Sequence, residues 1–240
     1  WRGFWNHGTG ALGDMGCHIM DVPIKALGLF EPFSIEASVS NLPYAKAFTP
    51  SPLIEEACPS SSYITYKFRP SEINNSEVKM AWMDGGLRPS HPDIITDADD
   101  IGPNGALMIG ENGLIWCDNY GVKARLYIKG QEGVVETGKV SEINSVEFGH
   151  QNHWIDAIKD GYGSDKHRSL TSNFDFAGPL SEVVLLGNVA IRSTYIRRSP
   201  RSNIFIGKKR LMYDSKKMEI TNLDKANQFL TREYRAGWEI

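Results

Sequence analysis

Alternating apolar and polar residues predict a series of short strands in the first half of the chain. In residues 33–41 every second residue is apolar, as expected for a strand with one buried face. Residues 106–118 hold two apolar runs around Glu111-Asn112-Gly113, which predicts a hairpin with a tight turn. The stretches with strand character are residues 33–41, 62–69, 76–84, 106–118 and 123–130. Their short connections favour an antiparallel meander over β-α-β crossovers.

Helical spacing of apolar residues marks the two ends of the chain. Asp14 is a candidate N-cap, Gly28 a stop signal, and Pro23 is expected to kink the helix between them. The stretches with helical character are residues 14–27, 150–161, 178–196, with Pro179 in its first turn, and 222–238, capped by Asn222 or Asp224. Residues 210–214 and 217–221 predict two further short strands. The sum is an α+β fold, a single domain over residues 1–240 with one broad, open, mainly antiparallel sheet and helices on one face.

Composition narrows the classes of function. Hydrophobic residues make up 41% of the chain and charged residues 23%, a balance typical of soluble globular proteins. The net charge of -3 gives no basic footprint, so nucleic acid is not an expected partner. No run approaches about eighteen consecutive apolar residues, so no membrane span is predicted. Three cysteines without a CxxC pair predict neither a disulfide framework nor a structural zinc site.

The densest group of chemically useful residues lies in the first 21 positions. On a helix, Asp14 and His18 would share one face, with Asp21 three residues beyond. A carboxylate beside an imidazole favours the protonated ring and can orient it, so the pair can exchange a proton with a substrate hydroxyl. The alternative is a helix cap with a surface hydrogen bond, because the spacing is common by chance. Metal binding is disfavoured, since Cys17 and His18 are adjacent and point in different directions.

Other residues are candidates for ligand contact. Trp5 offers a flat apolar face of the kind that packs against sugar rings. His153 could reach a polar pocket, or could simply flank its helix together with Trp154, Ile155 and Ile158. Asp175 precedes a helix, where it could act as a cap. The basic cluster at residues 197–201 is expected to be a solvated surface rather than a phosphate site.

The glycine-rich stretch GTGALG does not predict a dinucleotide site. It follows Trp-Asn-His rather than an apolar strand, and no acidic residue ends a following strand in the usual place.

The motif GTGALGDMGCHIMD resembles the substrate-domain motif of the Gfo/Idh/MocA oxidoreductases, the family of glucose-fructose oxidoreductase and inositol dehydrogenase. GPNGALMIGENG, FAGPLSEVVLLGNVAIR and ANQFLTREYRAGW resemble the Bacteroidetes and Planctomycetes branch of that family. The resemblance extends from residue 1 to residue 238. It implies the C-terminal, dihydrodipicolinate reductase-like substrate domain, in a chain that begins part-way through a longer protein whose N-terminal Rossmann domain binds NAD or NADP. No NAD or NADP is expected on this chain alone.

The resemblance also implies roles for individual residues. His18 falls on the family's acid/base histidine, and Asp14 on the aspartate that orients it or hydrogen-bonds the substrate. Asn6 stands where this branch has an aspartate. Asn6 and His7 are therefore expected to contact the substrate and to change which substrate the protein accepts. The implied activity is oxidation of a CH–OH group of a sugar, sugar derivative or cyclitol. The implied partners are that carbohydrate, the Rossmann domain and further copies of the chain, bound through the sheet face.

Two alternatives remain open. Some relatives use tightly held NAD for transient oxidation that leads to glycosidic bond cleavage, so a glycosidase or lyase is one. A non-catalytic carbohydrate-binding module is the other.

Overall fold

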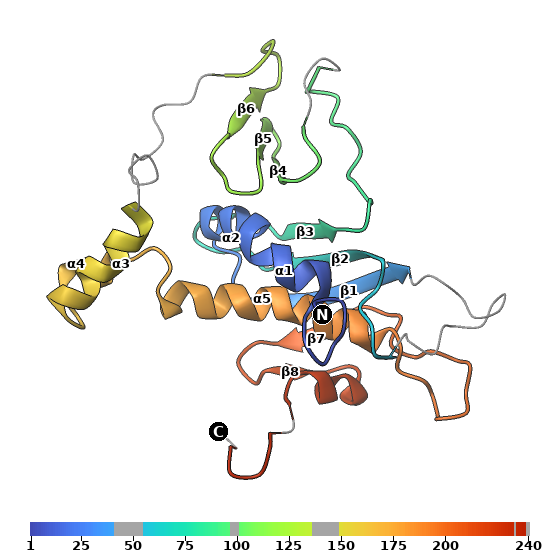
Figure 1. The fold of residues 1–240 in the computed structure, drawn as a ribbon. Coiled ribbons are helices and arrows are strands. Elements are labelled where there is room, and N and C mark those ends of the chain that lie inside the picture. The colour runs from blue at the N-terminus through green and yellow to red at the C-terminus, as the bar shows by residue number, and fades with distance from the viewer. Residues whose placement is uncertain (41–54, 97–100, 136–148, 233, 239–240) are drawn as a thin grey trace.

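The computed structural model describes residues 1–40, 55–96, 101–135, 149–232 and 234–238, which form an α+β fold (Figure 1). The larger sheet has the strand order β3-β2-β1-β7-β8, and the smaller sheet has the order β4-β5-β6. The larger sheet contains β1 (Pro32–Ser40), β2 (Ser61–Phe68), β3 (Val78–Met83), β7 (Leu211–Asp214) and β8 (Glu219–Ile220). The smaller contains β4 (Ala106–Ile109), β5 (Gly113–Cys117) and β6 (Arg125–Ile128). All of these strand pairs are antiparallel.

The expected strands and the α+β class are confirmed, but the single broad sheet is wrong. The predicted hairpin exists, with the Gly110 amide donating to the Gly113 carbonyl at 2.9 Å. Its strands pair with β6 and not with the larger sheet, and they pack a small core of their own around Leu114, Trp116 and Tyr127. Alternation shows which side of a strand is buried, but it does not identify the partner strand. Residue 41 of the first predicted strand lies outside the described residues.

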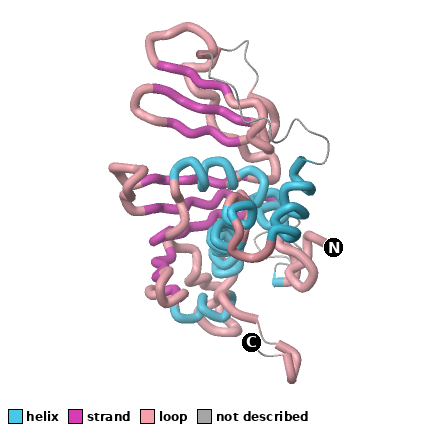
Figure 2. The backbone as a smooth tube through the Cα atoms, turned by 90° about the vertical axis from the view of Figure 1, so that its left-hand side faces the viewer, coloured by secondary structure: helices cyan, strands magenta, loops and turns pink. Residues whose placement is uncertain are grey.

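The central helix α5 (Phe174–Ser193) lies against the inner face of the larger sheet, and Figure 2 shows most helices on one side of the strands. Helix α1 (Gly10–Ile19) crosses it in the antiparallel sense, because Gly16 lies against Val184 and Leu12 lies at Gly187. Helix α5 comes close to the sheet at Gly187, where an added Cβ would collide with the hydroxyl of Tyr66 from β2. Gly187 therefore faces both Tyr66 of the sheet and Leu12 of α1, and the two helices share one core with the sheet.

The predicted helix at residues 14–27 is two helices, α1 and α2 (Asp21–Leu27), which meet at Met20. Pro23 explains the break, because it has no N–H to donate to the carbonyl of Ile19 and its ring crowds that position. Gly28 ends α2 in the left-handed conformation, with φ 64°, as predicted. Asp14 is not the N-cap, since α1 begins four residues earlier at Gly10.

Three other helix predictions need correction. Helix α5 begins at Phe174, so Pro179 lies inside the helix rather than in its first turn. Asn173 is the cap of α5, accepting a hydrogen bond from the Phe176 amide at 3.3 Å. The predicted closing helix is only a short 3₁₀ helix, η3 (Asp224–Phe229), while the Asn222 side chain binds the backbone beside β7 and caps nothing. Residue 233 of that prediction lies outside the described residues.

Helix α3 (Gly149–Asp160) ends before Gly161 as predicted and leads into α4 (Asp165–Arg168). Its expected apolar side is exposed, with Trp154 61% and Ile158 61% accessible. The outer face of the larger sheet presents mainly polar side chains, including Glu36, Ser38 and Lys67, the last paired with Glu77 at 2.6 Å. The homo-oligomer was predicted because an uncovered apolar sheet face would need a partner. This face is mainly polar, so the homo-oligomer stays a prediction without that support.

Within the described part of the chain, one helix has the length and apolar character of a membrane span. This is α5, and half of the relevant stretch is buried inside the molecule. A core helix of this kind passes the same test, so the observation is weak evidence for a span.

Candidate functional site

The exposed side of α1 carries the two residues that the sequence singles out. Asp14 and His18 are one turn apart on this helix, as their spacing requires. The Asp14 carboxylate accepts from the guanidinium of Arg2 at 2.7 Å, and both side chains are solvent-accessible. Within the described ranges, Asp14 makes no hydrogen bond with the His18 imidazole. The Asp14 carboxylate is therefore paired with Arg2 of the N-terminal loop and not with His18. An exposed ion pair of this kind adds little to the stability of the fold.

The imidazole of His18 packs against Tyr120, a residue that the sequence analysis did not select. The two rings meet edge to face with centroids 5.6 Å apart and an interplanar angle of 82°. Tyr120 lies in the turn after β5, where the Asp118 carboxylate accepts from the amides of Tyr120 and Val122. Such an aspartate-led turn is readable in the sequence, but its position beside α1 is not.

The turn is held against α2 by a close backbone approach. Gly121 has φ 70°, and a Cβ there would lie 2.6 Å from Cγ2 of Val22. A larger residue would be strained by its φ and would push the turn away from α2. Tyr120 precedes Gly121 in this turn, so the turn of the smaller sheet brings the Tyr120 ring into contact with His18.

Asp21 is a second carboxylate near His18, and its pKa is shifted from the ordinary value. It is the first residue of α2, three residues after His18, and its Oδ1 is buried with no hydrogen-bond partner in the described structure. Burial raises the pKa of the Asp21 carboxyl, while the nearby charges of Lys25 and His18 oppose the rise. A carboxyl with raised pKa beside an accessible imidazole is a typical proton-handling arrangement.

Within the described ranges, no hydrogen bond, ion pair or ring contact links the other predicted residues to His18 or Asp21. Asn6 and His7 are exposed in the N-terminal turn. His153 lies on α3, where its Nε2 is 3.2 Å from Oγ of Ser169 rather than in a polar pocket. Asp175 is exposed in the first turn of α5 and is not the cap.

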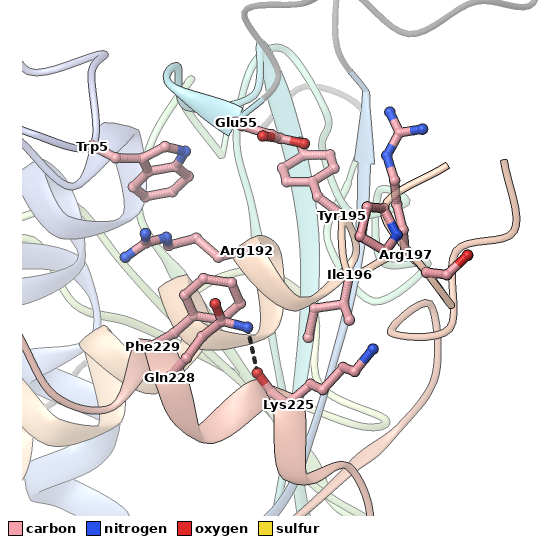
Figure 3. Close-up of a pocket in the computed structure, with 11 residues that line it drawn as sticks. Trp5, Glu55, Arg192, Tyr195, Ile196, Arg197, Lys225, Gln228 and Phe229 are labelled. Carbon is pink, nitrogen blue, oxygen red and sulfur yellow. Dashed lines mark hydrogen bonds between the residues drawn. The ribbon is translucent and has the colours of Figure 1, made fainter. Parts of the chain in front are cut away.

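Trp5 lines a separate cavity of about 790 Å³, shown in Figure 3. The cavity lies among the N-terminal loop, the end of α5 and η3, and its walls are formed by Trp5, Glu55, Arg192, Tyr195, Ile196, Arg197, Ser199, Pro200, Lys225, Gln228 and Phe229. The basic cluster at residues 197–201 is mostly exposed as predicted, at Arg198 and Arg201, while Arg197 lines this cavity. Sequence reasoning missed the cavity because it assigned Arg192 and Phe229 to helices without indicating which surfaces meet.

The described residues offer no cradle for a dinucleotide. Their strands pair only in the antiparallel sense, and the glycine-rich stretch that opens α1 follows a turn instead of a parallel strand. Within the same ranges, no three His, Cys, Asp or Glu side chains gather as a metal site.

No family model matches the chain, and none of the curated proteins compared with it matches.

Proposed function

We propose that this chain is the substrate-binding part of an NAD(P)-dependent oxidoreductase that acts on a CH–OH group of a sugar, sugar derivative or cyclitol. The observation that carries the proposal is the accessible His18 imidazole on α1, beside a carboxyl whose pKa burial raises. The motif around these residues, with its resemblance to the Gfo/Idh/MocA family and its dihydrodipicolinate reductase-like substrate domain, supports the same assignment.

His18 acts as the acid/base in this proposal. Removing hydride from a CH–OH carbon also requires the loss of the hydroxyl proton, and an imidazole accepts such a proton near neutral pH. Tyr120 packs against one edge of the His18 ring and restricts its orientation. Asp21 lies within electrostatic reach of His18, whose charge opposes the rise that burial causes in the pKa of the Asp21 carboxyl. Asp14, which accepts a hydrogen bond from Arg2, is proposed to hydrogen-bond a second substrate hydroxyl.

In this proposal the hydride acceptor binds outside the described residues, whose strand pairs are all antiparallel and form no β-α-β unit. It is assigned to the N-terminal Rossmann domain that the motif resemblance implies. The 240-residue chain alone is accordingly expected to show no dehydrogenase activity.

The test follows nicotinamide absorbance in the full-length gene product with a panel of sugars, amino sugars and inositols. His18→Ala is expected to lower kcat by about 10²-fold or more, the usual contribution of a positioned acid/base. His150→Ala is the matched control, because His150 is an exposed histidine on α3. Equal loss in both variants, or no loss in His18→Ala, contradicts the assignment. If no compound changes the nicotinamide absorbance while nicotinamide stays bound to the purified protein, the redox-assisted glycosidase or lyase is favoured instead.

A further inference from the structure

The cavity beside Trp5 contains Arg192, whose guanidinium forms no ion pair with a carboxylate among the described residues. The guanidinium carbon of Arg192 lies 5.6 Å from the ring centroid of Trp5 and 4.4 Å from that of Phe229. Figure 3 shows Arg192 between these two rings. Aromatic rings cover the faces of a guanidinium and leave the N–H groups on its edge available to an oxyanion. In the described structure, no carboxylate forms an ion pair with Arg192.

The surroundings of Arg192 add positive charge instead of removing it. Burial lowers the pKa of the Arg192 guanidinium, and the neighbouring Arg232 lowers it further. Arg197 and Lys225 also line the cavity. Arg197 donates to the Ser202 carbonyl at 3.2 Å, and Lys225 donates to the Arg198 carbonyl at 3.3 Å. Both partners are neutral carbonyls, so the cavity keeps its excess of cations over its one lining carboxylate, Glu55.

The walls also present polar and apolar groups that suit a ring with hydroxyls. Trp5, Tyr195 and Phe229 supply aromatic surface to the same space. Glu55 is an acceptor for hydroxyl groups, and it would repel a second negative charge on a bound anion.

We propose that this cavity binds an acidic sugar, with Arg192 holding its carboxylate and Trp5 packing against its ring. The planar fork of a guanidinium matches a carboxylate through two parallel N–H···O bonds. A singly charged carboxylate suits the cavity better than a phosphate dianion because of Glu55. The proposal is independent of the oxidoreductase assignment, since His18 lies toward the other end of α1, about 12 Å along its axis from Gly10.

The test is calorimetric titration of the full chain with glucuronate, with glucose as its uncharged counterpart and with inorganic phosphate. Glucuronate is expected to bind at least about tenfold more tightly than glucose, and Arg192→Gln to abolish that preference. Arg201→Gln removes the same charge from an exposed position outside the cavity and is expected to bind like the parent chain.

Two further variants make the result decisive. Arg192→Lys keeps the charge but loses the fork, so it is expected to bind glucuronate more weakly than the parent and more tightly than Arg192→Gln. Trp5→Phe is expected to weaken glucuronate while leaving the melting temperature close to that of the parent chain. Equal binding of glucose and glucuronate by the parent chain overturns the proposal even if Arg192→Gln does not fold. Tighter binding of phosphate than of glucuronate overturns it too.

Discussion

The close approach of α5 to the sheet at Gly187 gives a prediction that can be worked out from the packing. Gly187→Ala would place a methyl group against the Tyr66 hydroxyl and 2.5 Å from Cδ2 of Leu12. Alanine favours a helix over glycine by about 1 kcal/mol, whereas overpacking a core costs about 1–3 kcal/mol. The Tyr66 ring is fully buried in the same layer, so the clash cannot be relieved toward solvent. After the gain in helix propensity is subtracted, we expect Gly187→Ala to lower the free energy of unfolding by up to about 2 kcal/mol.

Tyr66→Phe should rescue much of that loss. The Tyr66 hydroxyl is buried without a hydrogen-bond partner in the described structure, so its removal leaves no polar atom newly unpaired. In the double variant the nearest atom of the ring would be Cζ, at 3.2 Å from the new methyl, and the Leu12 contact involves the end of a flexible side chain. The coupling energy between the two substitutions is expected to be about 1 kcal/mol.

Urea unfolding followed by circular dichroism would measure the four corners of this cycle. Gly178→Ala, in the same helix, is the matched control, because a Cβ at Gly178 meets nothing within 4 Å. Pro179 follows this position and disfavours a helical residue with a Cβ, so that variant is expected to gain less than the ~1 kcal/mol of helix propensity. The packing argument is refuted if Gly187→Ala is as stable as Gly178→Ala, or if its cost is unchanged in the Tyr66→Phe background.

Two further predictions concern carboxylates. Burial raises the pKa of Asp21 above its ordinary value of 3.8, so the folded chain binds that proton more tightly than the unfolded chain and stability falls as the pH rises through the folded pKa. Asp21→Asn should therefore be more stable than the parent chain near neutral pH, with the difference in urea midpoint shrinking as the pH falls toward 3.8; a difference independent of pH would contradict this. Asp84 accepts hydrogen bonds from the amide and hydroxyl of Ser62 and from the indole of Trp82, at 2.6, 2.7 and 2.7 Å. Asp84→Asn should lower the free energy of unfolding by about 1–3 kcal/mol, and an unchanged urea midpoint would show that these bonds contribute nothing.

Local pattern determined the elements of this protein because each element follows from neighbours in sequence. Alternation predicted β1 and β2, since side chains of a strand alternate between its faces. Gly28 and Gly161 predicted the ends of α2 and α3. The pattern failed at the start of α1, where glycines have low helix propensity and the first turn lies against Cys58 and the backbone of Arg2.

Only the tertiary structure decided which residues share a site. The sequence placed Asp14 and His18 on one helix face, because helix spacing is a local property. It could not place Tyr120 over His18, since that contact depends on a second sheet whose turn presses on α2. It also could not place Arg192 between Trp5 and Phe229, which are 187 and 37 residues away along the chain. Hydrophobic burial specifies which face of an element turns inward, but the shape of the packed core selects which surfaces meet.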